Sequence, residues 1–325
     1  MIKCVAVIGL GNISTRHRQN LRQLYPDALI IAMSASGRIP EQPISDADKI
    51  VVDMSALISE VPDFVVVASP ASFHADHAIP LLESHIPVLV EKPVTHNEQH
   101  LLRLVHAASE SDTLCSVAYC LRFLPCLKML KKMLESAEFG NVYNAHIEVG
   151  QYLPDWRNGT DYRCSVSGSK KLGGGALLEL SHELDYANWL FGDLSLMYSE
   201  LRATDELDIA VEQVVDLFLK SDSNVTVVAH LDFIQKQATR KCIVITEKCR
   251  IECDLIANSI TVRNGIGDEV IYSEPSWNKN GMYLEMLSRF VESMQGSETE
   301  MVSIAEAGKT VKLIDKIKSY HHEFK

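Results

Sequence analysis

The chain has 325 residues, of which 46% are hydrophobic and 23% are charged. These values are typical of a globular protein, and the length suffices for two domains that each bury a core. The formal net charge is −12. A field of this sign repels phosphate backbones, so we expect no nucleic-acid partner, although a small anionic molecule could bind to a local group of arginines.

The sequence predicts a cytoplasmic protein with no membrane partner. Met1 leads directly into a strand-like run over residues 3–8 rather than into an export signal, and no apolar stretch approaches the roughly 20 residues needed to span a bilayer. Without an export signal, the eight scattered cysteines are expected to be reduced. Cys242, Cys249 and Cys253 form a loose group that lacks paired C-x-x-C spacing, so we expect no metal.

The first strand ends in a glycine-rich turn, Gly9-x-Gly11-x-x-Ser14, which a helical pattern follows through Leu24. In a dinucleotide-binding turn, the first glycine permits the tight bend and the second lets the backbone approach a pyrophosphate. Asn12 and Ile13 then open a helix whose N–H groups and dipole favour phosphate. The strand before and the helix after the motif support this prediction over a purely structural turn.

The second strand, residues 28–33, ends in a segment that bears on cofactor selectivity. An NAD-selective site carries an acid here to hold the ribose 2′-hydroxyl. This chain has Ser34, Ser36 and Arg38 instead, groups that suit a 2′-phosphate. We therefore expect NADP(H) in preference to NAD(H), with a merely solvated Arg38 as the alternative.

Further strand and helix patterns alternate up to residue 121. Buried strands at 63–68 and 88–90 are each followed by polar residues at the position where the strand ends, and a further strand over 115–119 closes the unit. Repeated βα units predict a doubly wound parallel sheet, a Rossmann domain over residues 1–121. Open sheets of this kind place ligands at the carboxyl ends of the strands. We expect these end residues to line the cofactor site: Ser69, Pro70, His74, Glu91 and Lys92.

Residues 122–325 follow a different pattern and predict an α+β domain with a large, mostly antiparallel sheet. Strand-like segments follow one another with few helices between them. They are 141–150, 195–203, 210–219, 224–233, 240–246, 249–254, 259–263 and 268–273. We expect helices on one face of this sheet. A broad uncovered face favours self-association, so we predict a homodimer or homotetramer.

A glycine triplet at 173–175 opens a segment with three candidate catalytic groups. Glu179, His182 and Asp185 follow at three-residue spacing, which on one helix places neighbouring pairs on a shared face. Histidine titrates near neutrality and can accept a proton from a hydroxyl, and a carboxylate one turn away can orient it. The alternative is a surface helix with a solvated histidine.

Taken in order, these motifs resemble those of the Gfo/Idh/MocA family of sugar-type NAD(P)-dependent oxidoreductases. The series consists of the glycine turn, Ser69-Pro70 with His74, Glu91-Lys92-Pro93, Arg122-Phe-x-Pro125, and the glycine triplet followed by Glu179, His182 and Asp185. The resemblance covers essentially the whole chain. It implies that Lys92 and His182 face the nicotinamide and the substrate, and Arg122 joins the expected cofactor site.

Two departures from the family pattern concern the partner of the histidine. Family members usually carry Asp at the position of Glu179, with the histidine four residues later instead of three. The extra methylene of Glu179 could compensate for the shorter spacing, or the shortening could re-aim His182. Whether Glu179 or Asp185 supports His182 stays open at this point.

The predicted reaction is hydride transfer between nicotinamide and a secondary alcohol or ketone of a sugar. His182 would act as general acid/base, and Lys92 would hydrogen-bond the same oxygen. Two functional alternatives stay open: a sensor that binds the dinucleotide without turnover, and a glycosidase that oxidises and re-reduces its sugar with a tightly held NAD.

Residues 151–157 and 161–163 form a segment rich in aromatic and charged residues, and we expect this segment to contact the substrate. Tryptophan and tyrosine stack on sugar faces, and arginines clamp carboxylates or phosphates. The segment resembles a subset of the family linked with bacterial surface-glycan and sialic-acid-like sugars, which favours an anionic or nucleotide-linked sugar. The alternative is a packed lid with surface ion pairs. The expected substrate-binding residues are Lys92, Tyr119, Trp156, Arg157, Tyr162, Arg163 and His182.

Overall fold

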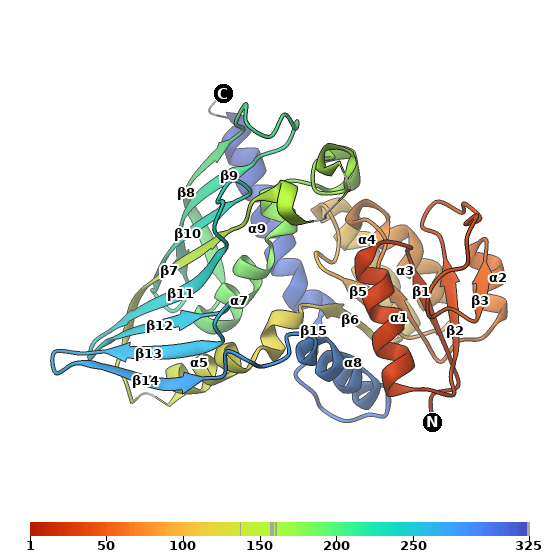
Figure 1. The fold of residues 1–325 in the computed structure, drawn as a ribbon, viewed down its shortest axis with the longest axis horizontal. Coiled ribbons are helices and arrows are strands. Elements are labelled where there is room, and N and C mark those ends of the chain that lie inside the picture. The colour runs from red at the N-terminus through yellow and green to blue at the C-terminus, as the bar shows by residue number, and fades with distance from the viewer. Residues whose placement is uncertain (137, 157–158, 160, 324–325) are drawn as a thin grey trace. The chain divides into compact units, whose positions relative to one another are not determined.

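The computed structural model describes residues 1–136, 138–156, 159 and 161–323, and the side chains of 321–323 lie outside that description. The chain packs into two compact units, each built from two stretches of sequence (Figure 1). The first unit holds Met1–Tyr119 and Tyr283–Val311, and the second holds Cys120–Met282 and Lys312–Lys325. The division into domains at 121/122 stays a prediction.

The first unit is built on a seven-stranded sheet whose first six strands are parallel. Across the sheet their order is β3-β2-β1-β4-β5-β6, the arrangement of dinucleotide-binding folds, and β15 adds an antiparallel edge next to β6. The strands are β1 Cys4–Ile8, β2 Leu29–Met33, β3 Lys49–Val51, β4 Phe64–Val67, β5 Val88–Glu91, β6 Cys115–Ala118 and β15 Val302–Ser303.

Both faces of this sheet are covered, which explains why its strands read as continuous apolar runs. On one face, Val65 and Val67 belong to a core that includes leucines of α3 and α4. On the other face, the Phe64 ring meets the Phe290 ring of α8 edge-on at 5.4 Å between centroids. The helices of this unit are α1 Asn12–Leu24, α2 Met54–Ser59, α3 His74–Glu83, α4 Glu98–Ser111, α8 Gly281–Met294 and the first part of α9 Ile304–Glu323.

The second unit is built on an eight-stranded sheet, in the order β14-β13-β12-β11-β7-β10-β9-β8. All neighbouring pairs are antiparallel except β10 and β7, which run parallel. The strands are β7 Val142–Gly150, β8 Leu194–Arg202, β9 Val214–Ser221, β10 Thr226–Asp232, β11 Thr239–Thr246, β12 Arg250–Asp254, β13 Ser259–Arg263 and β14 Asp268–Ser273.

Helices of this unit lie against one face of its sheet, as Figure 1 shows for α5 and α7. That face carries the inward side chains of the alternating strands, such as Val227, Ala229 and Leu231 of β10, which are buried with leucines of α5 and α7. The helices are α5 Pro125–Glu135, α6 Ala176–Glu179, α7 His182–Phe191 and the end of α9; short 3-10 turns lie at Cys120–Phe123, Leu153–Trp156, Tyr162–Cys164 and Lys170–Leu172.

The predicted fold class, a Rossmann sheet plus a large and mostly antiparallel second sheet, is confirmed. Two short strands of the first sheet were not predicted, β3 and β15, because three and two residues are too few to show a periodic pattern. The strand expected over 210–219 begins only at Val214. None of the helices in the described part of the chain is long and apolar enough to cross a membrane.

Candidate functional site

The carboxyl ends of four neighbouring parallel strands of the first unit carry the predicted cofactor residues. Gly9 follows β1, Ser34 follows β2, Ser69 comes just after β4, and Glu91 ends β5 with Lys92 next to it. Because β2, β1, β4 and β5 are adjacent in the sheet, these end residues share one edge. This is where open α/β sheets bind their ligands.

The glycine-rich turn has the backbone geometry that a dinucleotide needs. Gly9 has φ +118°, and a Cβ there would lie 2.4 Å from the carbonyl oxygen of Ala68, so no other residue fits. Ser14 Oγ donates to the same oxygen at 3.1 Å and holds α1 against the end of β4. A Cβ at Gly11, in contrast, would meet nothing within 4 Å. The open space at Gly11, before the first turn of α1, fits a pyrophosphate.

Glu91 is almost completely buried, and each of its carboxylate oxygens has a partner. Nε2 of His17 lies 2.7 Å from Oε1, and the backbone N–H of Lys92 donates to Oε2 at 3.0 Å. Burial by itself would raise the pKa of Glu91, but the hydrogen bond from His17 and the positive charge of Lys92 outweigh it and hold this pKa below its usual value. Glu91 is thus an ionised anchor for the first residue after β5.

Two histidines of α3 connect the loop after β4 to neighbouring loops. The buried His74 ring places Nε2 2.7 Å from the carbonyl oxygen of Ser69 and Nδ1 2.9 Å from that of Pro93. Burial lowers the pKa of His74 in spite of these carbonyl groups. His77 Nδ1 lies 3.0 Å from Ser69 Oγ. His74 therefore positions the loops of the cofactor edge, and its direct contact with a cofactor stays a prediction.

The segment after β2 shows the hydroxyl groups expected for cofactor selectivity. Ser34 is buried with its Oγ 3.3 Å from Oγ of Ser36, while Arg38 is exposed. A second arginine, Arg18 of α1, is buried and donates through Nε to the carbonyl oxygen of Ser45 at 2.9 Å. Burial lowers the pKa of Arg18 although Asp46 lies nearby. Arg18 was not among the predicted site residues.

In the second unit, the segment after the glycine triplet is not one helix. The four-residue α6 ends at Glu179, and α7 begins at His182 after a turn in which the Glu183 N–H donates to the Leu180 carbonyl at 3.3 Å. The expectation that one helix carries all three residues was therefore wrong: His182 and Asp185 are three residues apart on α7, but Glu179 lies on α6. The break re-aims His182 relative to Glu179, and His182 itself is 8% exposed.

The carboxylates near His182 each have a different partner. Glu179 accepts from Ser167 Oγ at 3.0 Å. Asp185 takes a bidentate hydrogen bond from Arg122, 2.9 Å from Nε and 2.8 Å from Nη2, and both side chains are buried. Arg122, predicted to bind the cofactor, is thus the ion-pair partner of Asp185; any contact of Arg122 with a cofactor stays a prediction.

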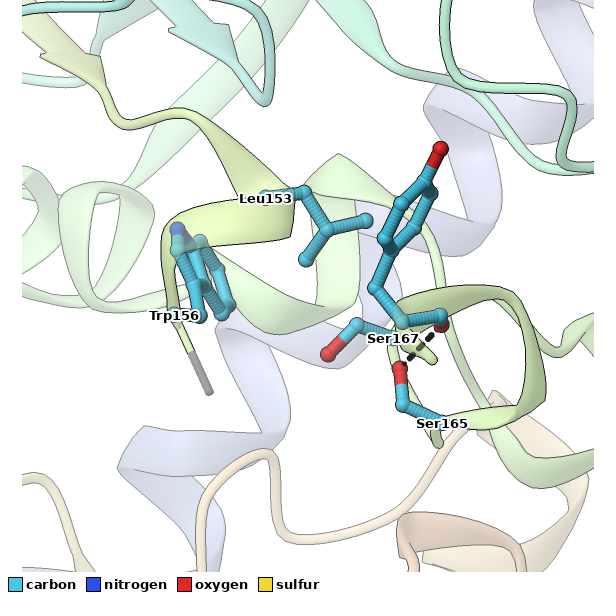
Figure 2. Close-up of a pocket in the computed structure, with 5 residues that line it drawn as sticks. Leu153, Trp156, Ser165 and Ser167 are labelled. Carbon is cyan, nitrogen blue, oxygen red and sulfur yellow. Dashed lines mark hydrogen bonds between the residues drawn. The ribbon is translucent and has the colours of Figure 1, made fainter. Parts of the chain in front are cut away.

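A small pocket in the second unit brings together two of the predicted substrate residues. Trp156 and Tyr162 line it with Leu153, Ser165 and Ser167 (Figure 2), and the cavity of about 10 Å³ has room for roughly one water molecule. The Trp156 ring lies edge-on to Phe233 at 5.3 Å, and Tyr162 Oη donates to the Leu207 carbonyl oxygen at 3.0 Å. Both aromatic rings are therefore held in place.

The other predicted substrate residues lie apart from this pocket or outside the description. Arg163 is exposed and pairs with Asp161 at 3.3 Å. Tyr119 follows β6 and is 0% exposed in the core of the first unit. Arg157 is outside the described residues. Among the side chains that are described, no three His, Cys, Asp or Glu residues could hold a metal together, and Cys242 and Cys253 face each other as buried free thiols on β11 and β12.

His17 is the site residue that sequence analysis missed. A signal for it was present: Ser14, His17 and Leu21 repeat at three and four residues and form the buried face of α1. A histidine on the buried face of a helix needs a hydrogen-bond partner. The partner, Glu91, lies 74 residues away in sequence, and no local pattern connects the two.

Each of the two units matches a known protein-family model. A model described as the oxidoreductase family, NAD-binding Rossmann fold, matches residues 3–119, and one described as the GFO/IDH/MocA C-terminal domain matches residues 127–252. Inositol 2-dehydrogenase of Corynebacterium glutamicum is 29% identical over 145 residues, a match that spans 42% of this chain and 42% of that protein. Myo-inositol 2-dehydrogenase of Thermotoga maritima is 25% identical and is matched over 95% of this chain and 93% of its own.

Solved structures give the same result for the fold. Levoglucosan dehydrogenase, in complex with NADH and levoglucosan, superposes with a TM-score of 0.85 at 16% identity, covering 99% of this chain and 97% of that one. The two family models together span most of the sequence, and the first of them covers the glycine-rich turn and Glu91-Lys92-Pro93. The chain therefore belongs to the Gfo/Idh/MocA family of oxidoreductases.

Proposed function

We propose that this protein is an NAD(P)-dependent oxidoreductase that transfers a hydride between the cofactor and a secondary alcohol or ketone of a sugar-type substrate. The observation that carries the proposal is the placement of Lys92. It follows β5 at the sheet edge that also holds the dinucleotide turn, next to an ionised and buried Glu91. The names of its relatives, inositol 2-dehydrogenases, support a substrate with hydroxyl groups on a ring.

Each proposed catalytic residue has a distinct role in this chemistry. When bound, the nicotinamide supplies the hydride acceptor for oxidation or the donor for reduction. Lys92 hydrogen-bonds the substrate oxygen and stabilises negative charge on it as the proton leaves. His182 accepts that proton in oxidation and returns it in reduction. Asp185 is already held by Arg122 and Glu179 by Ser167, so we propose that these carboxylates shape the surroundings of His182.

We propose the substrate class from the side chains of residues 151–163, because the pocket itself is too small for a sugar. Trp156 and Tyr162 offer aromatic surface suited to the apolar face of a sugar ring. A substrate carboxylate or phosphate would compete with Asp161 for the exposed Arg163, and Arg157 adds a second positive charge in the same stretch of sequence. We therefore favour an anionic or nucleotide-linked sugar over a neutral one.

A substrate panel tests the proposal. Purified protein is incubated with NAD⁺ or NADP⁺ and with inositols, neutral hexoses, uronic acids and nucleotide-linked sugars, and reduced cofactor is followed by absorbance at 340 nm. We expect reduction with at least one ring-hydroxyl compound. Tight cofactor binding without turnover on the whole panel would support a sensor, and hydrolysis without net cofactor reduction would indicate a glycosidase.

We propose that the protein prefers NADP(H). Ser34, Ser36 and Arg38 stand where an NAD-selective site has an acid, and a charge-assisted hydrogen bond from Arg38 to the 2′-phosphate would add affinity. Changing Arg38→Ala is expected to weaken NADPH binding by about 10-fold and to leave NADH binding nearly unchanged. Fluorescence titration of both cofactors measures this, with Arg103→Ala, an exposed arginine of α4, as the control. Tighter binding of NADH to the wild-type protein would refute the preference.

We propose further that a second copy of the chain covers the outer face of the second sheet. A row of apolar groups crosses this face in register, Tyr198 of β8 with Phe218 of β9 and Phe218 with Val228 of β10. Tyr198 and Phe218 are 52% and 44% exposed, and such a patch on a sheet favours association.

A cytoplasmic location stays a prediction.

Changing Phe218→Asp is expected to convert the oligomer to monomer, because a carboxylate would be buried in an apolar contact. Light scattering coupled to size-exclusion chromatography gives the molar mass. The control is Leu102→Asp, which changes a 56% exposed leucine of α4 in the first unit and should leave the mass unchanged. A monomeric wild-type protein, or an oligomeric Phe218→Asp variant, would contradict the proposed interface.

A further inference from the structure

We propose that His17 is a positioning residue for Lys92, acting through Glu91. The proposal rests on the proposed function, because Lys92 is the group that it positions. His17 lies on the second turn of α1, the helix that follows the dinucleotide turn, and its side chain is 0% exposed. The imidazole reaches across to the end of β5 and contacts Glu91 Oε1 at 2.7 Å. One side chain thus connects the cofactor helix to the catalytic strand end.

The two carboxylate oxygens of Glu91 bind different partners, one on α1 and one at the end of β5. Oε1 is bound by His17, and Oε2 accepts the backbone N–H of Lys92 at 3.0 Å. The carboxylate therefore has one oxygen for α1 and one for the residue whose side chain does the chemistry. On the other side of Lys92, the Pro93 carbonyl oxygen lies 2.9 Å from His74 Nδ1. The backbone N–H of Lys92 is thus held by Glu91, which His17 binds, and the carbonyl group of the next residue lies beside a second buried histidine.

Among the described residues, Glu91 is the one hydrogen-bond partner of the His17 side chain. Its Nδ1 is buried and makes no hydrogen bond there, and its ring lies edge-on to Tyr283 of α8 at 6.2 Å between centroids. The contact with Glu91 is therefore made by an Nε2–H donor, which fixes the tautomer. An apolar side chain at this position would fill the same space against Tyr283 without bonding Glu91.

The energetic reason for the arrangement is the burial of a carboxylate. A buried carboxylate that loses its partner either takes up a proton or turns toward water. A protonated Glu91 would no longer be a full acceptor for the Lys92 N–H, and a rotated Glu91 would release it altogether. Either change lets Lys92 move by a distance that matters for hydride transfer, since a misplacement of about 1 Å can cost about 100-fold in rate.

The test compares four variants of the full-length protein. His17→Ala removes the bond to Glu91. His17→Gln restores a donor, because the Gln amide nitrogen falls close to the position of Nε2. His17→Ala with Glu91→Ala removes both partners and so removes the unpaired buried charge. The control is Asp48→Asn. It weakens the ion pair of Asp48 with Arg22, which lies in the last turn of α1 and away from the end of β5.

We expect His17→Ala to lower kcat by about 100-fold while KM and the cofactor Kd change by less than about threefold. His17→Gln should recover most of kcat. The double variant should recover thermal stability relative to His17→Ala but not turnover, because the Lys92 N–H still has no acceptor. Asp48→Asn should leave kcat unchanged. Hydrogen exchange at the Lys92 amide should speed up in His17→Ala and in the double variant, and stay slow in His17→Gln.

Three results would overturn the inference. They are wild-type kcat in His17→Ala, turnover in the double variant that recovers in step with its stability, and unchanged exchange at the Lys92 amide. Failure of the proposed function is distinguishable, because it would appear as no turnover by the wild-type protein on any substrate. The exchange measurement needs no turnover, so it still decides whether His17 holds Lys92 in that case.

Discussion

Replacing Lys92 by Met is expected to lower kcat by about 10²–10³-fold, with a much smaller loss of cofactor affinity. Methionine keeps the length and the apolar stem of lysine but has no charge and no N–H donor. What disappears is the stabilisation of negative charge on the substrate oxygen, an electrostatic contribution that is largest in the transition state. We expect binding of the dinucleotide to depend mainly on the glycine turn and α1, which the substitution leaves intact.

His182→Ala should give a loss of similar size, because a positioned general acid/base contributes about 10²–10⁴-fold. The two single losses are not expected to add in the double variant, since both residues act on the same proton transfer. Steady-state kinetics on the substrate found in the panel, together with fluorescence titration of the cofactor, measure both effects.

Two exposed residues provide matched controls for these variants. Lys49→Met removes a lysine of β3 that pairs with Glu60 on the surface, and His106→Ala removes an exposed histidine of α4. Both should retain kcat within about twofold, as surface substitutions away from a site usually do. Wild-type turnover in Lys92→Met or in His182→Ala would refute the assigned role of that residue.

Breaking the buried ion pair of α7 with β11 should have the largest effect on stability. Glu183 is 0% exposed and takes a bidentate hydrogen bond from Arg240, 2.7 Å from Nε and 2.9 Å from Nη2. Burial alone would lower the pKa of Arg240, yet the carboxylate keeps it above its usual value. Arg240→Met leaves an unpaired buried carboxylate and is expected to lower the free energy of unfolding by about 3–5 kcal/mol.

Changing the other partner, Glu183→Gln, should lower the free energy of unfolding by less, because the Arg240 side chain is 24% exposed and keeps some contact with water. Glu183→Leu combined with Arg240→Met should recover most of the loss, since no unpaired charge is then left in the core. The three tryptophans, Trp156, Trp189 and Trp277, all lie in the second unit. Urea unfolding followed by tryptophan fluorescence therefore reports on this unit.

Arg263→Met is the control for the ion pair. It breaks surface pairs with Asp268 and Glu252, and pairs of this kind contribute only about 0–1 kcal/mol each. A loss for Arg240→Met no larger than that of Arg263→Met would show that the buried pair does not stabilise the second unit.

The Rossmann unit could be read from the sequence because its signals are local. A strand, a glycine turn and a helix follow one another within residues 3–24, and Gly9, Gly11 and Ser14 stand at the fixed spacing of the motif. Lys92 was identified in the same way, as a charged residue at the end of a buried strand. In the second half, the alternation of apolar and polar residues placed each strand of the sheet to within a few residues.

The partners of the polar groups could not be read in this way. The turn between α6 and α7 has helix-compatible residues, and the three-residue spacing of Glu179, His182 and Asp185 suggested one helix where there are two. Asp185 is bound to an arginine 63 residues away, and Glu183 to one 57 residues away. Only the structure shows that α9 is shared, because its Ala307 and Val311 belong to the core of the first unit and its Ile314 and Ile317 to that of the second.

The sequence by itself determined the fold class, the family and the place of Lys92 after β5, because periodicity, turn chemistry and motif order are properties of neighbouring residues; the catalytic roles of Lys92 and His182 stay predictions. The tertiary structure decided which charges are paired: Glu91 with His17, Asp185 with Arg122 and Glu183 with Arg240. The physical reason is that a buried carboxylate must find a donor wherever the packed chain supplies one. The arrangement of helices and strands in space determines which residue is the donor. The donor therefore stands at no fixed spacing from the carboxylate in the sequence.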